Sequence, residues 1–123
     1  MRFAPILACV LISLSVAGCA NGPNGQSASD GGSLAYNGAS SGSHNSSFDC
    51  DGSGEAAFAA NLGGGSATVT VKDAAGKTVY SKTANGPGQT AETKDITGTA
   101  GTWTVSASRT SGFSGQYALD VDC

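Results

Sequence analysis

The chain has 123 residues, with 9 acidic against 6 basic side chains and only 12% of its residues charged. This length accommodates one small domain and excludes a multidomain enzyme. The net charge of −3 provides no basic surface for a phosphate backbone, so we expect no nucleic-acid partner.

The first eighteen residues are typical of an export signal. Met1 and Arg2 give a positive start, and the apolar segment 3–16 follows without a charge. This segment is shorter than the roughly 20 residues that a helix needs to cross a bilayer, and small residues follow it directly. We therefore predict a signal peptide over residues 1–18 that is removed after export.

The end of this signal reads Val16-Ala17-Gly18-Cys19, which resembles the lipobox of bacterial lipoproteins. The resemblance implies that Cys19 becomes the lipid-bearing N-terminus, where two or three acyl chains hold a domain at a membrane firmly. Ala20 stands where an Asp commonly retains Gram-negative lipoproteins in the inner membrane. The resemblance therefore implies a lipid anchor in the cell envelope, in the outer membrane of a Gram-negative bacterium. An ordinary signal peptide, cut near Ala17 or Ala20, is the alternative.

Residues 19–44, which include Cys19, are predicted to form a flexible tether. Gly, Ser, Ala and Asn supply 19 of the 24 residues from 20 to 43. Such a composition buries too little surface to become ordered. Leu34 and Tyr36 are the large apolar residues of this segment, and we expect them to dock transiently without forming a strand. The folded domain is predicted to span residues 45–123.

This domain is predicted to consist of short strands separated by turns. Apolar side chains alternate over 56–62 and over 67–71, and the glycines of 63–65 lie between them, which predicts a hairpin. Clear alternation also surrounds Trp103 and Tyr117. Further turns are predicted at 73–76, 85–88 and 98–101. The pattern indicates an all-β fold, a small antiparallel immunoglobulin-like β-sandwich of six to seven strands, with a small barrel as the alternative.

Cysteine counting predicts one disulfide. Cys9 leaves with the signal peptide and Cys19 carries the lipid, so Cys50 and Cys123 remain in an oxidising compartment. A bond between them would clamp both ends of the domain together. A loop of this length contributes roughly 4 kcal/mol in the chain-entropy model.

Strand alternation also places four carboxylates outside the sandwich, next to the predicted disulfide. Hard cations such as Ca²⁺ take oxygen ligands, so these residues form a candidate calcium site, with Glu55 or loop carbonyls completing it. The spacing lacks the known calcium-loop motifs, and charges on edge strands commonly prevent aggregation, so a solvated face is the alternative. The four carboxylates are Asp49, Asp51, Asp120 and Asp122. No other cofactor is predicted.

No catalytic set is predicted from the sequence. The segment Gly38–Gly42 has the letters of a nucleophile elbow, but that elbow needs a strand before it and a helix after it. The sole histidine, His44, and Asp49 lie too close in the chain for a braced triad. We therefore predict that the protein is not an enzyme.

Aromatic residues divide into two groups by strand phase. Trp103, Phe58 and Tyr117 have the inward phase and are assigned to the core. Tyr80 and Phe113 are the candidate exposed binding residues, since Tyr80 is out of phase with its neighbour and Phe113 lies in a loop. Outward threonines reflect strand propensity and are given no role; they are Thr68, Thr70, Thr102 and Thr104.

Two segments, 101–105 and 115–121, resemble the closing strands of accessory β-sandwich modules in secreted bacterial proteins. The expected function is therefore that of a membrane-anchored lipoprotein that presents its β-sandwich as a non-enzymatic interaction or envelope-structure module. Its partner would be an envelope or extracellular protein or a polysaccharide, and accessory carbohydrate binding is one alternative.

A second alternative is an inhibitor of a lysozyme-like or other envelope-attacking enzyme. The segment Phe48–Gly52 resembles the opening of one family of periplasmic lysozyme inhibitors. The inhibitory loop of that family is matched only loosely here, by Ser111 and Gly112 before Tyr117.

Overall fold

The computed structural model describes residues 26–30 and 32–123, so the predicted signal peptide and Cys19 lie outside the described residues. Strands and their connections make up this part of the chain, with no helix among them. In the described ranges, no helix has the length and apolar character needed to cross a membrane. The nine strands are β1 (Gln26–Asp30), β2 (Ser33–Gly38), β3 (Gly42–Cys50), β4 (Ser53–Gly64), β5 (Ser66–Lys72), β6 (Thr78–Asn85), β7 (Gly88–Thr97), β8 (Gly101–Arg109) and β9 (Ser114–Asp122).

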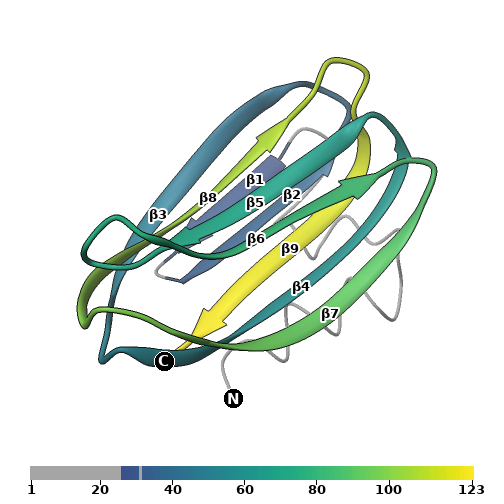
Figure 1. Cartoon of the computed structure of the whole chain (residues 1–123). Coiled ribbons are helices and arrows are strands. Elements are labelled where there is room, and N and C mark those ends of the chain that lie inside the picture. Colours follow the sequence, from purple (N-terminus) through teal and green to yellow (C-terminus); the bar gives the residue numbers. More distant parts are fainter. Residues whose placement is uncertain (1–25, 31) are drawn as a thin grey trace.

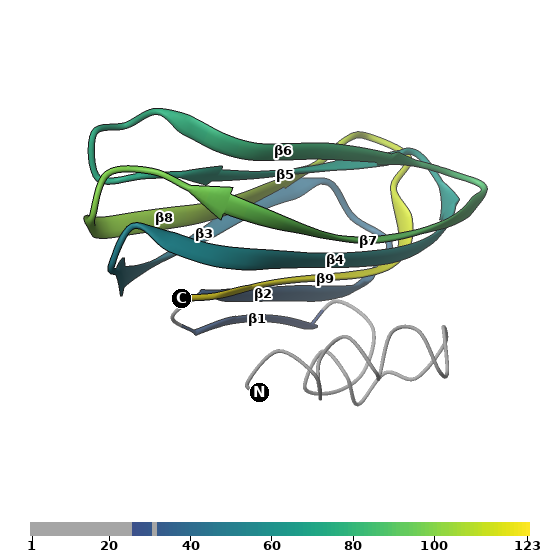
Figure 2. The same cartoon turned by 60° about the horizontal axis from the view of Figure 1, so that its bottom comes forward.

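The strands form two antiparallel sheets, stacked as two layers (Figures 1 and 2). One sheet has the order β1-β2-β9-β4-β7, and the other has the order β3-β8-β5-β6. From β2 to β9 the chain changes sheet at every connection except that between β5 and β6. This connectivity is that of a jelly roll. The predicted antiparallel β-sandwich is confirmed, with nine strands in the described residues instead of six to seven.

The hairpin predicted for residues 56–71 is wrong, because β4 and β5 belong to different sheets. Strand β4 pairs with β7 and β9, whereas β5 pairs with β6 and β8. The glycines of 63–65 therefore carry the chain from one sheet to the other. Gly65 has a φ of 68°, and a Cβ there would lie 2.6 Å from the backbone nitrogen of Phe113. Only glycine fits this position.

The core lies between the two sheets and takes the inward side chains of both. Trp103 and Phe58 are fully buried and Tyr117 nearly so, which confirms their assignment to the core. The indole nitrogen of Trp103 donates a hydrogen bond to the carbonyl oxygen of Thr99 at 2.7 Å. This bond satisfies the polar atom of the largest core side chain, as burial requires.

The tether predicted for residues 19–44 is wrong for its described part. Strand β2 pairs with β9 in a register that places Leu34 opposite Leu119 and Tyr36 opposite Tyr117. Leu34 is fully buried and Tyr36 is 3% exposed. The Gly- and Ser-rich composition concealed this alternation, which becomes stable because β9 offers a strand to pair with. The sandwich therefore begins before residue 45.

The predicted disulfide between Cys50 and Cys123 is confirmed, with a Cα–Cα distance of 5.4 Å. Cys50 is the last residue of β3, and Cys123 directly follows β9. Because β3 and β9 lie in different sheets, the bond joins the two layers of the sandwich.

Candidate functional site

The outer face of the four-stranded sheet carries short polar side chains, most of them hydroxyls. Because side chains alternate along a strand, the positions between the core residues point away from the sandwich. The register of β3, β8, β5 and β6 aligns these positions in rows across the sheet. The first row is Ser43, Ser108, Thr68 and Thr83; the second is Asn45, Ser106, Thr70 and Ser81; the third begins with Ser47, Thr104 and Lys72. We call these three rows the hydroxyl face.

The spacing of the hydroxyl face follows from sheet geometry. Neighbours in one row are roughly 4.8 Å apart across the strands, and successive rows are roughly 6.7 Å apart along them. Each residue of the three rows is half-buried or exposed. The β-branched threonines have a restricted χ1 angle, so their hydroxyls are held in few orientations. The hydroxyl face is therefore an accessible and ordered array of donors and acceptors.

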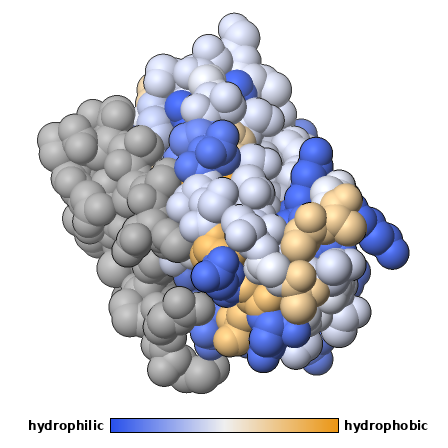
Figure 3. Space-filling model, turned by 90° about the vertical axis from the view of Figure 1, so that its left-hand side faces the viewer, coloured by the Kyte–Doolittle hydropathy of each residue, from blue (hydrophilic) through white to orange (hydrophobic). Residues whose placement is uncertain are grey.

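Cross-strand hydrogen bonds further order this face. The hydroxyl oxygens of Thr68 and Thr83 are 2.9 Å apart, and those of Ser47 and Thr104 are 3.5 Å apart. The first two rows contain no charged residue, and Lys72 is the charge in the third. Figure 3 views the molecule from the edge on which β3 lies, and there pale colours of intermediate hydropathy cover much of the described surface. The face therefore offers hydrogen bonding with little net charge.

Aromatic side chains are absent from the three rows of the hydroxyl face. In residues 32–123, six aromatic residues are buried in the core, and Phe48 is half-buried. Phe48 packs against Trp103 inside the sandwich, with ring centroids 6.3 Å apart. The hydroxyl face therefore has no ring on which a ligand could stack.

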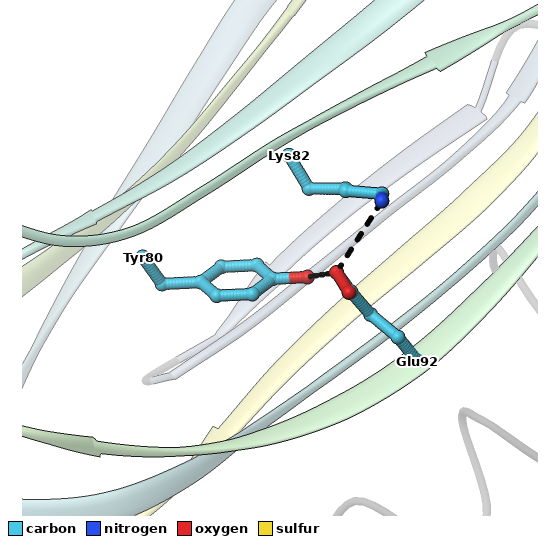
Figure 4. A network of polar contacts seen from close by, with 3 residues as sticks. All are labelled: Tyr80, Lys82 and Glu92. Atoms are coloured by element: carbon cyan, nitrogen blue, oxygen red, sulfur yellow. Dashed lines mark hydrogen bonds and ion pairs between the residues drawn. The ribbon is translucent and has the colours of Figure 1, made fainter.

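The prediction that Tyr80 is exposed is wrong. Its side chain is 5% exposed, and its hydroxyl donates a hydrogen bond to Oε1 of Glu92 at 2.7 Å (Figure 4). Lys82 Nζ lies 3.8 Å from the same oxygen. The β5–β6 register shifts between Val71 and Lys72. Tyr80 lies opposite the core residue Val71, so its side chain points into the core. Burial and the bond to Glu92 both raise the pKa of Tyr80. Tyr80 therefore links β6 of one sheet to β7 of the other.

The prediction that Phe113 is an exposed contact is also wrong. It is 2% exposed and packs edge-on against Tyr36 and Tyr117, with centroids 5.7 and 5.9 Å away. The loop between β8 and β9 thus closes one end of the core. The loop and strand that loosely matched the lysozyme-inhibitor family contribute Phe113 and Tyr117 to this core.

His44 belongs to a polar cluster beside this end of the core. Nε2 of His44 lies 2.6 Å from the hydroxyl of Tyr117, which accepts a hydrogen bond from Nη1 of Arg109 at 3.0 Å. The Arg109 guanidinium also lies 3.6 Å from the ring centre of Tyr36. Burial, and secondly the positive charge of Arg109, lower the pKa of His44 to about 4. The cluster holds a neutral imidazole and braces the two sheets.

The segment Gly38–Gly42, which has the letters of a nucleophile elbow, links strand β2 to strand β3. A nucleophile elbow requires a helix after the turn, and a strand follows here. The geometry of this segment is therefore that of an ordinary connection between the two sheets.

The structure does not bring the four candidate calcium ligands together. Asp49 lies on β3 of the four-stranded sheet, whereas Asp120 lies on β9 of the other sheet. Outward side chains on the two sheets point to opposite sides of the molecule. Asp120 accepts a hydrogen bond from the Ser33 hydroxyl, and Asp51 accepts one from the backbone N–H of Ser53 at 3.2 Å. Asp122 faces Glu55 across the β4–β9 pair. Within the described ranges, no group of three or more His, Cys, Asp or Glu side chains could hold a metal.

The outer face of the five-stranded sheet differs from the hydroxyl face. Its middle row places Ala35, Ala118, Ala59 and Ala91 side by side on four adjacent strands. The middle row of this face therefore carries methyl groups in place of hydroxyls, and the hydroxyl face is the candidate binding surface.

Sequence reasoning missed the hydroxyl face, although its signal is visible. Hydroxyl residues recur at every second position in 68–70, 81–83, 102–104 and 106–108. Each short pattern alone matches ordinary strand propensity. The strand order and register were needed to show that the patterns align.

Comparisons with known proteins locate the fold among solved structures. No protein-family model matches the chain, and no curated protein matches it. A structure described as "CBM4 structure and function" is similar with a TM-score of 0.52 and 12% identity, over 93% of this chain and 82% of that one. The pre-peptidase C-terminal domain of a Bacillus anthracis collagenase has a TM-score of 0.51 and 16% identity, over 83% and 99%. Identities this low show a shared fold and nothing further.

Proposed function

We propose that the protein is a non-catalytic binding module whose ligand is a neutral polysaccharide, held on the hydroxyl face. The observation that carries this proposal is the alignment of polar side chains, most of them hydroxyls, in rows across the four-stranded sheet. Hydroxyls donate and accept hydrogen bonds, as do the hydroxyls of a sugar. The fold that the chain shares with the CBM4 structure supports the proposal.

Chemistry favours a polysaccharide over a protein or an ionic ligand. Protein interfaces commonly depend on aromatic or arginine anchors near their centre, and the three rows of the hydroxyl face contain neither. The neutrality of the first two rows also offers nothing to steer a strongly charged partner. A neutral, hydroxyl-rich polymer matches the surface in both respects.

Co-sedimentation with insoluble polysaccharides tests this proposal. The full chain, carrying Cys19→Ser to prevent acylation, would be mixed with three neutral insoluble polysaccharides: cellulose, chitin and mannan. We expect it to sediment with at least one of them. The double variant Thr70→Val, Ser106→Ala removes two adjacent hydroxyls of the central row and should reduce the bound fraction several-fold.

Thr93→Val is the matched control, since Thr93 is an exposed threonine on β7 of the other sheet. It should bind like the parent chain. The proposal fails if none of the three polymers retains the protein. It also fails if the double variant binds as well as the Thr93→Val control, because the hydroxyl face is then not the site. Circular dichroism would verify that each variant is folded.

We also propose that Cys19 carries the lipid anchor, which would place the module at the cell envelope. The support is the lipobox resemblance of residues 16–19. Intact mass of the membrane-extracted protein tests this proposal independently of ligand binding. A mass that begins at Cys19 and includes acyl chains is expected, and an unacylated mass would overturn the anchor.

A further inference from the structure

We propose that the hydroxyl face recognises the ordered surface of an insoluble polysaccharide and not a single soluble chain. This inference rests on the proposed function and adds the physical state of the ligand. It follows from three features of the face: its regular rows, its rigidity and its lack of aromatic side chains.

The rows repeat in two directions, which a single sugar chain cannot use fully. The first two rows each contain four side chains, contributed by β3, β8, β5 and β6 in turn. One extended chain would follow one row or one strand and leave the other positions in contact with water. The packed chains of a solid polysaccharide present hydroxyls in two directions at once. Only such a surface can engage several rows together.

Energetics favour many simultaneous contacts. Each hydrogen bond replaces bonds to water and contributes about 1 kcal/mol net, whereas association costs at least ~4 kcal/mol in lost freedom. A soluble oligosaccharide that touches two or three hydroxyls would scarcely recover this cost. Stacking on an aromatic ring could supply the difference, but the hydroxyl face has none. Binding therefore requires a ligand that contacts many hydroxyls at once.

Rigidity makes such a distributed contact possible. Thr68 and Thr70 lie on β5, which is paired on both sides by β6 and β8. Their short, β-branched side chains lose little freedom on binding. The bond between Cys50 and Cys123 also ties the edge strand β3 to the second layer. The array is therefore organised before the ligand arrives, which lowers the entropic cost of each contact.

The test compares one polysaccharide in two physical states, using the same full chain with Cys19→Ser. The insoluble polymer that sediments the protein is titrated to obtain an apparent Kd. Soluble oligosaccharides of the same polymer are then titrated by calorimetry. We expect binding to the solid and a Kd weaker than about 1 mM for the oligosaccharides. If the oligosaccharides bind as tightly as the solid, through residues of the hydroxyl face, the inference is overturned and the proposed function survives.

A stepwise variant series provides a second measurement. Thr70→Val removes one hydroxyl, and adding Ser106→Ala and then Thr68→Val removes a second and a third from adjacent positions. Each removal should weaken binding to the solid by about fivefold, because each hydroxyl contributes about equally. Loss of all binding after one substitution, with the fold intact, would indicate a single localised subsite and would contradict the inference. If the parent protein binds no solid polymer, both the inference and the proposed function fail.

Discussion

Cys50 and Cys123 are bonded across the sandwich, from the end of a strand in the four-stranded sheet to the residue that follows the last strand of the five-stranded sheet. The bond closes a loop of 73 positions and holds the edge strand β3 in place. Strand β3 contributes one end of each row of the hydroxyl face. The disulfide therefore matters for the candidate site as well as for the fold.

Removing this bond should destabilise the domain. The double variant Cys50→Ala, Cys123→Ala is expected to lower the free energy of unfolding by about 2–4 kcal/mol. Urea titrations of the parent and the variant would measure the loss. The parent in reducing agent is the control and should behave like the variant. An unchanged transition under reduction would show that the bond contributes nothing.

Leu34→Ala tests whether β2 belongs to the folded domain. Leu34 is fully buried against the core, so the substitution should cost about 2–4 kcal/mol of unfolding free energy. Ser41→Ala, in the exposed connection that follows β2, should change it by less than about 0.5 kcal/mol. Equal stabilities for the two variants would mean that residues 33–38 are a tether after all.

Tyr80→Phe isolates the hydrogen bond between the two sheets. The substitution keeps the ring and removes the hydroxyl that donates to Glu92, so the unfolding free energy should fall by about 1–2 kcal/mol. Lys82→Met removes only the more exposed ion pair at 3.8 Å and should cost less than about 0.5 kcal/mol. Chemical denaturation of both variants compares the two contacts, and the reverse ranking would contradict this account.

Stability should depend on pH through His44. Its pKa is about 4 in the folded protein, against an ordinary value of 6.5. Above pH 6.5 the imidazole is neutral in both states, and its environment imposes no penalty. Between pH 6.5 and 4 the His44 imidazole binds a proton in the unfolded chain but stays neutral in the folded protein. The unfolding free energy therefore falls as the pH is lowered. Allowing for solvent screening at this half-buried site, the loss should be about 1–2 kcal/mol.

His44→Gln separates this contribution from that of the carboxylates. Glutamine can still bond to the Tyr117 hydroxyl but does not titrate in this range. Asp73, whose pKa is lowered chiefly by backbone hydrogen bonds from Thr99 and Lys77, contributes to both proteins alike. The variant should therefore lose less stability than the parent between pH 6.5 and 4. Parallel stability curves would exclude His44 as the titrating group.

The features that could be predicted from the sequence are those that depend on the alternation of apolar and polar side chains along a single strand. Inward positions such as Phe58 and Trp103, and the pairing of Cys50 with Cys123, follow from strand phase and from cysteine counting. Alternation does not specify which strand pairs with which, so the connection after β4 resembled a hairpin. The β5–β6 register shift, which gives Tyr80 its inward phase, depends on tertiary pairing and has no signature in the sequence.

The candidate site depends on the same missing information, the strand order and the register. A threonine such as Thr70 is unremarkable in a single strand, because β-branched residues favour strands generally. Its place opposite Ser106 on one side and Ser81 on the other appears only once the strand order is known. The four acidic residues illustrate the opposite error. They lie near the two ends of one disulfide, which suggested a cluster, but the strands that bear Asp49 and Asp120 belong to different sheets.

The most direct measurement of the central claim is solid-state NMR of threonine-labelled protein that has been sedimented with the polysaccharide it binds. Thr68, Thr70 and Thr104 lie on the hydroxyl face, whereas Thr93 and Thr97 lie on β7 of the other sheet. We predict that magnetisation passes from the polymer to the methyl groups of the first three threonines and not to those of the last two. Transfer confined to Thr93 and Thr97, or equal transfer to all five, would contradict the claim.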